Sequence, residues 1–198
     1  MVKVIGIGGG AGSGKSTVAS FLEEKGVKVL ELDALSRKLA QKGGPIWKGI
    51  VRTWGRFFLD PRGNIDRKKL GKVIFRNFTA LLLLNRLTHP LLFQETRKWL
   101  NRNREENLVA IDGTILFEGG FLPILDWVIF VEGDLDLRWR RLVAKGWKEK
   151  EAQNLLSAQR FSSCLRRRAH FVLWNQDSRE KLRQEVENFW CSLPLKGK

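Results

Sequence analysis

Residues 9–16 read Gly9-Gly10-Ala11-Gly12-Ser13-Gly14-Lys15-Ser16. An apolar run that predicts a buried strand precedes them, and residues 17–22 predict a helix. A glycine-rich turn between a strand and a helix is the setting of a phosphate-binding loop. Glycines let the backbone curl so that several N–H groups face one anion, and the helix N-terminus adds its positive end. We therefore expect this segment to bind the phosphates of a nucleotide.

The side chains at the end of this loop have separate expected roles. Lys15 is placed to reach the β- and γ-phosphates, and the hydroxyl of Ser16 to bind Mg2+. ATP and Mg2+ are therefore the expected cofactors. The predicted nucleotide-binding residues of the loop are Gly10, Ala11, Gly12, Ser13, Gly14, Lys15, Ser16 and Thr17.

Five apolar runs predict the strands of a buried parallel sheet, and helical patterns lie between them. This alternation predicts an α/β fold with a five-stranded parallel sheet flanked by helices. The runs are residues 2–7, 27–32, 108–111, 127–131 and Phe171–Trp174.

The gap between the second and third runs is longer than one crossover helix needs. We expect a single domain, residues 1–198, with a helical insertion at 45–105 and a lid region at about 135–168. Asp66 is a candidate N-cap, and residues 60–64 form a turn between two of the inserted helices. The expected helices of the insertion are Pro45–Trp54, 66–75, 78–89 and 90–103.

The net charge of +15 is large. It suits nucleic acid, an acidic membrane surface or a polyanionic small substrate, and composition alone does not choose among them. No apolar stretch is long enough to span a bilayer, and there is no basic leader followed by an apolar run. Cys164 and Cys191 show neither metal spacing nor a disulfide framework. We expect a cytoplasmic monomer or small homo-oligomer without a membrane partner.

Ligands of an open parallel sheet bind beyond the carboxyl ends of its strands. Asp33 follows the second run, where it is placed to accept the proton of a hydroxyl that attacks the γ-phosphate. Arg37, one helical turn on, is placed to hold an anionic group of the substrate. Capping of the following helix is the other reading of Asp33, and the two roles are compatible. Asp112 ends the third run and could accept from a Mg2+-bound water or from Lys15.

Arg138, Arg141 and Lys145 share one face of a helix in the predicted lid region. A cationic face closing over a triphosphate would stabilise the transferring group, and Arg141 is the strongest of the three candidates. The other reading is a solvated basic face. Asn175 follows the fifth run and is expected to bond an edge of adenine.

Further candidates for substrate contact lie around the insertion and after the third strand. His89 precedes Pro90, at an expected break between two helices. The segment after Asp112 could line the site with Leu116, Phe117 and Glu118.

With these residues in place, the chain resembles the dephospho-CoA kinase family over nearly its whole length. The Asp-Arg-x-x-Leu-Gly block, combined with His-Pro and Leu-Phe-Glu, is more specific than the glycine-rich loop, which many kinases share. In the family segment that residues 32–37 resemble, the aspartate, here Asp33, is taken as the general base. The segments that carry the resemblance are 6–17, 32–37, Gly44-Pro45 with Trp54-Gly55, 63–75, 88–90 and 116–118.

The resemblance implies ATP-dependent phosphorylation of the ribose 3′-hydroxyl of dephospho-CoA, on a P-loop core with a helical CoA-binding region and a lid. The chain departs from the family pattern at Thr114, Lys145, Leu155 and His170. Another small-molecule kinase of this fold, acting on a nucleoside or a nucleoside monophosphate, is the alternative. A nucleic-acid-associated NTPase is less favoured, because the third strand is followed by Asp112-Gly113 and not by an Asp-Glu pair. We expect small-molecule partners and no nucleic acid.

Overall fold

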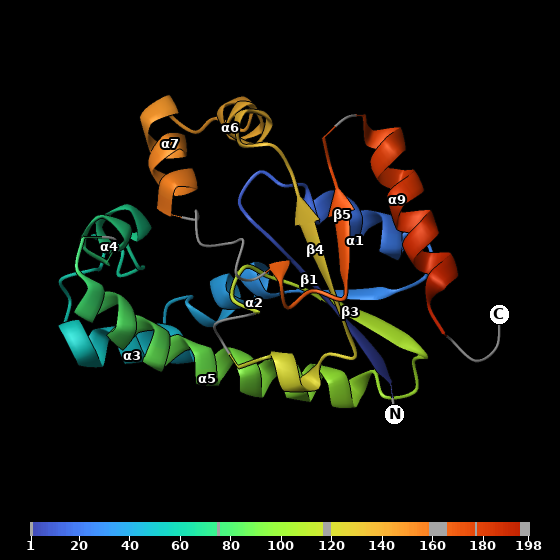
Figure 1. Ribbon diagram of the computed structural model, residues 1–198. Helices are drawn as coiled ribbons and strands as arrows, with labels where there is room; N and C mark the ends of the chain where they lie inside the picture. The colour runs from blue at the N-terminus through green and yellow to red at the C-terminus, as the bar shows by residue number, and fades with distance from the viewer. Residues whose placement is uncertain (1, 75, 117–119, 159–165, 177, 195–198) are drawn as a thin grey trace. The chain divides into compact units, whose positions relative to one another are not determined.

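The computed structural model of the protein describes residues 2–194, except 75, 117–119, 159–165 and 177. Five strands of this part of the chain form one sheet, in the order β2-β3-β1-β4-β5 (Figure 1). The predicted α/β fold is confirmed, and each predicted strand lies within two residues of its observed bounds. The strands are β1 Lys3–Gly9, β2 Lys28–Glu31, β3 Leu108–Asp112, β4 Trp127–Glu132 and β5 Phe171–Trp174.

The first strand lies at the centre of the sheet, parallel to β3 on one side and β4 on the other. The register places Ile7 opposite Asp112 in β3 and Ile129 in β4. Both faces of β1 are buried, which explains why its sequence is a continuous apolar run. The carboxyl ends of the three central strands therefore meet at the edge where the glycine-rich loop, residues 9–16, begins.

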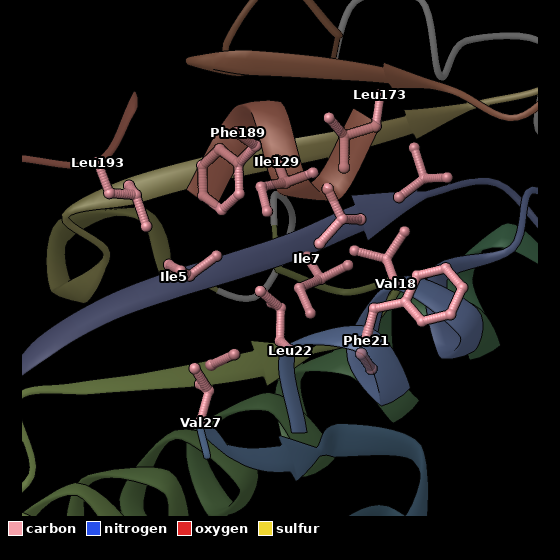
Figure 2. Packing of buried hydrophobic residues seen from close by; sticks show 14 of the residues in the cluster. Ile5, Ile7, Val18, Phe21, Leu22, Val27, Ile129, Leu173, Phe189 and Leu193 are labelled. Atoms are coloured by element: carbon pink, nitrogen blue, oxygen red, sulfur yellow. The ribbon is translucent and has the colours of Figure 1, made fainter. Parts of the chain in front are cut away.

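Two helices, α1 (Lys15–Glu23) and α9 (Arg179–Ser192), pack together on the sheet. Figure 2 shows Ile5 and Ile7 of β1 facing Leu22 of α1 and Phe189 of α9. Each such side chain contributes about 1.5–3 kcal/mol when it is removed from water. This core fixes β1 and α1, which are the two elements that hold the ends of the glycine-rich loop.

The contacts divide the chain into two compact units. The sheet unit comprises Met1–Leu30 and Asn103–Lys198, and the helical unit comprises Glu31–Arg102. The sheet unit also contains the short η1 (Leu122–Ile124) and the contacting helices α6 (Leu135–Ala144) and α7 (Glu149–Ala158). The helices of the helical unit are α2 Leu32–Leu39, α3 Pro45–Trp54, α4 Arg67–Ile74 and α5 Phe78–Arg102.

Three local signals in the helical unit are confirmed, namely the bounds of α3, the N-cap Asp66 and the turn at residues 60–64. The predicted bounds of α3 match the observed ones, and the carboxylate of Asp66 accepts from the backbone N–H of Lys69 at 2.9 Å, as an N-cap does. The carboxylate of Asp60 closes the predicted turn by accepting from the backbone N–H groups of Arg62 and Asn64.

The break expected between residues 89 and 90 is wrong, because α5 continues through Pro90. Proline lacks the N–H that would bond one turn back, and inside a helix it costs about 3 kcal/mol relative to alanine. Leu84, Leu87 and Leu91 surround this position and pack into the core of the helical unit. Packing of the helix on both sides of the proline offsets this local cost. The prediction of a break at Pro90 took no account of that packing.

Candidate active site

The glycine-rich loop depends on backbone conformations that only glycine adopts readily. Gly12 and Gly14 have φ angles of 73° and 101°, in the left-handed region. Gly14 is also the N-cap of α1, and no described side chain caps that end of the helix. The loop therefore leads directly into a helix N-terminus, which favours an anion.

Four successive carbonyls of this loop, those of residues 10–13, accept hydrogen bonds from side chains. The carbonyl of one residue and the N–H of the next point in opposite directions within one peptide plane. Side chains from α6 and from the residue after β5 hold the carbonyls of residues 11–13, and this turns the N–H groups that follow toward the opposite side, where they can converge on an anion. The pairs are Lys15 Nζ with Gly10 O at 3.1 Å, Arg138 Nε with Ala11 O at 2.9 Å, Arg141 Nη1 with Gly12 O at 3.4 Å, and Asn175 Nδ2 with Ser13 O at 2.7 Å.

Helix α6 supplies two of these donors. Arg138 and Arg141 lie one turn apart on one face of the helix, as the spacing predicted, and both donate to the loop. Burial lowers the pKa of both guanidinium groups, and the nearby Glu132 opposes that effect on the pKa of Arg138. Arginine titrates so far above neutral pH that both groups stay charged.

Asn175 supplies the donor to Ser13. It directly follows β5, and its backbone N–H donates to the carbonyl of Glu132 at 2.8 Å. Its side-chain oxygen accepts from Arg141 Nη2 at 2.9 Å. Ser13, Asn175 and Arg141 thus form one hydrogen-bonded chain behind the loop.

The structure gives Arg141 and Asn175 partners that the sequence did not predict. Their expected contacts with the triphosphate and with adenine remain predictions. Arg138 was expected, with Arg141, on a cationic face that closes over the triphosphate. That role stays a prediction, and the carbonyl of Ala11 is the partner that the structure adds. Lys145 is exposed at the C-cap of α6.

Asp112 lies at the carboxyl end of β3, beside the end of β1. The N–H of Gly113 donates to the carbonyl of Ile7, which keeps the two chains paired as they leave the sheet. Asp112 is half-buried, and Leu116 is fully buried. Phe117 and Glu118 lie outside the described residues, so their expected contacts stay predictions.

The remaining predicted residues belong to the helical unit. Asp33 and Arg37 are exposed and lie one turn apart on α2, as expected. The helix begins at Leu32 with Glu31 as N-cap, so Asp33 lies within the first turn, where the helix dipole favours a carboxylate. His89 is half-buried inside α5, and α2 packs against that helix.

Two of the departures from the family pattern have structural partners in the sheet unit. The Nδ1 atom of His170 accepts from the backbone N–H of Val128 at 3.0 Å, which joins the start of β5 to β4. Leu155 packs in the small apolar cluster between α6 and α7, together with Leu142 and Ala11 of the loop.

In the described part of the chain, no three or more His, Cys, Asp or Glu side chains gather in a group that could hold a metal ion. Mg2+ that accompanies a nucleotide needs only one or two protein oxygens, because phosphates and waters supply the rest. Ser16 and Asp112 offer a hydroxyl and a carboxylate, which are oxygen donors of that kind.

Comparison with known proteins agrees with this arrangement. A crystal structure of a protein from Thermus thermophilus aligns with a TM-score of 0.82 and 30% identity, over 97% of this chain and 98% of that one. The parallel sheet and the glycine-rich loop between β1 and α1 define a P-loop kinase. The family model for dephospho-CoA kinase matches residues 3–181, and the chain belongs to that family.

Curated relatives agree in length as well as in sequence. A dephospho-CoA kinase of Corynebacterium diphtheriae is 33% identical over 192 residues, which is 96% of each chain. One of Moorella thermoacetica is 35% identical over 194 residues, covering 96% of this chain and 92% of that one. None of the helices in the described ranges combines the length and apolar character that crossing a bilayer requires.

Proposed function

We propose that this chain transfers the γ-phosphoryl group of ATP to the ribose 3′-hydroxyl of dephospho-CoA, giving CoA and ADP. Membership of the dephospho-CoA kinase family supports the substrate pair. The observation that carries the chemistry is the set of four loop carbonyls that accept hydrogen bonds from side chains, three of them from outside the loop. The net charge of +15 suits two polyphosphate substrates, because a positive surface raises their local concentration.

In this proposal the loop and its neighbours bind ATP. Backbone N–H groups of residues 10–17 and the ammonium of Lys15 stabilise the charge on the β- and γ-phosphates. Arg141 places its positive charge near the same phosphates while it donates to the carbonyl of Gly12. Asn175 bonds an edge of adenine. When Mg2+ is bound, Ser16 would hold it, Asp112 would accept from one of its waters or from Lys15, and the ion would neutralise charge on the phosphates.

Asp33 is the proposed general base. It accepts the proton of the 3′-hydroxyl as that oxygen attacks the γ-phosphorus, and its side chain is exposed. Arg37 and His89 contact dephospho-CoA. Leu116, Phe117 and Glu118 line the acceptor side together with Asp112.

Two longer segments of the chain have separate proposed roles. Residues 45–105 bind the CoA portion of the acceptor, and residues of about 135–168 act as a lid over the nucleotide. The partners are small molecules, and we expect a cytoplasmic enzyme that acts as a monomer or a small homo-oligomer.

The test is an assay of ADP release with ATP and Mg2+, with and without dephospho-CoA, and with a nucleoside as the competing acceptor. We expect rapid ADP release only with dephospho-CoA, and a product with a new 3′-phosphate by phosphorus NMR. Turnover of the nucleoside without turnover of dephospho-CoA would reverse the assignment of the acceptor.

A further inference from the structure

Arg138 is a charged side chain buried behind the glycine-rich loop. Only 3% of its surface is exposed, although it lies on a helix whose other arginines reach solvent. Its Nε donates to the carbonyl of Ala11 at 2.9 Å. The acidic side chain of Glu132 lies close enough to favour its charged form. Burying a guanidinium is costly unless its charge and its donors are used, so this position indicates a function beyond packing.

The loop is fitted closely around this one residue. A Cβ on Gly10 would collide with the guanidinium group of Arg138. A Cβ on Gly12 would lie 2.6 Å from the backbone carbonyl oxygen of Arg138, at a φ angle of 73°. The guanidinium group of Arg138 therefore lies against Gly10, and the backbone of α6 at the same residue lies against Gly12.

Two physical effects follow from this contact. The hydrogen bond fixes the peptide plane between Ala11 and Gly12, so the N–H of Gly12 is oriented before any nucleotide arrives. The positive charge lies behind a loop whose other side is expected to face phosphate, and charges in a buried setting interact more strongly than in water.

We propose that Arg138 is a positioning residue for the nucleotide, which fixes the Ala11 carbonyl and supplies a buried positive charge behind the phosphate-binding N–H groups. The inference rests on the proposed function only in requiring that ATP occupies this loop. Arg138 acts through the loop and through its charge, without touching the reacting atoms.

The test compares Arg138→Met with Arg140→Met, its exposed neighbour on α6. We expect Arg138→Met to weaken binding of ATP with Mg2+ about tenfold, as loss of one charged hydrogen bond does, with Arg138→Lys recovering most of the affinity. Arg140→Met should bind as the wild type does. Titration calorimetry gives the dissociation constants, and circular dichroism shows that each variant is folded.

The kinetic pattern separates positioning from simple loss of structure. We expect Arg138→Met to raise KM for ATP while KM for dephospho-CoA stays unchanged. Equal ATP affinity in folded Arg138→Met and wild type would overturn the proposal. If Arg138→Met does not fold, Arg138→Gln, which keeps a donor but no charge, decides in the same way. Wild type that binds no ATP at all would instead overturn the proposed function.

A double-mutant comparison tests the close contact itself. Gly10→Ala should weaken ATP binding in the wild-type background, because the new methyl group meets the guanidinium of Arg138. The same change should cost markedly less in an Arg138→Ala background, where that group is gone. An equal cost in both backgrounds would show that Arg138 does not shape the loop, and would overturn the proposal.

Discussion

The side-chain amide of Asn175 donates a hydrogen bond to the backbone carbonyl of Ser13 at 2.7 Å. The two residues are far apart in the sequence, yet this contact joins the end of β5 to the loop that follows β1. A Cβ on Gly14 would collide with the same amide. The last turn of the loop is therefore built around Asn175.

Gly14→Ala should destabilise the protein more than Gly26→Ala. Both glycines have φ in the left-handed region, at 101° and 84°, and a left-handed conformation costs alanine about 1–2 kcal/mol of stability at either position. Only at Gly14 does the added methyl group meet another side chain, since nothing described lies within 4 Å of a Cβ on Gly26. Urea unfolding measures the two losses, and equal losses would contradict the close approach of Asn175.

Asn175→Asp should weaken the loop, because a carboxylate cannot donate to Ser13 and would face its carbonyl oxygen. We expect the free energy of unfolding to fall by about 1–3 kcal/mol and KM for ATP to rise. Asn154→Asp, an exposed change of the same kind on α7, is the control. Urea denaturation and steady-state kinetics supply the two measurements, and a wild-type KM in folded Asn175→Asp would count against the role of this contact.

Asp33→Asn should abolish most turnover while ATP binding is kept, since the amide cannot take a proton from the 3′-hydroxyl. Loss of general-base catalysis lowers kcat by about 100- to 10,000-fold. The comparison variant is Glu105→Gln, which also removes one exposed negative charge. Single-turnover kinetics with calorimetry of ATP binding measure both effects, and an unchanged kcat would remove Asp33 from this role.

Lys15→Ala should impair both nucleotide binding and turnover. Its ammonium donates to the Gly10 carbonyl, so it lies against the loop whose N–H groups are proposed to hold the triphosphate. Losing one such preorganised group costs about 100-fold or more in kcat. Lys150→Ala on the exposed part of α7 controls for net charge. Wild-type kinetics in Lys15→Ala would contradict the assignment of the loop.

Phe189→Ala should destabilise the sheet unit by about 3–5 kcal/mol, the usual cost of removing a buried aromatic side chain. Phe189 is 3% exposed and packs edge-on against Phe171 of β5. Phe78→Ala removes the same group from a position that is 72% exposed and should cost little. Urea unfolding followed by circular dichroism distinguishes the two, and similar midpoints would contradict the packing of α9 on the sheet.

Local patterns were enough to predict most of the fold. The five strands follow from continuous apolar runs, because a parallel sheet covered by helices buries both faces of each strand. The bounds of α3 follow from Pro45 at its first turn and Gly55 just after its end. Pro90 is where this reasoning failed, since a proline predicts a break unless packing on both sides holds the helix together.

The candidate site, like the fold, was predicted from the sequence only in part. The order Gly9 to Ser16 determined by itself that a strand, a curled loop and a helix N-terminus follow one another, because glycine conformations and helix polarity are local properties. Only the tertiary structure decided what holds that loop in place. The donors to the carbonyls of Ala11, Gly12 and Ser13 come from more than 120 positions away, on α6 and after β5. Such partners depend on how the sheet orders its strands, and no spacing in the sequence encodes that order directly.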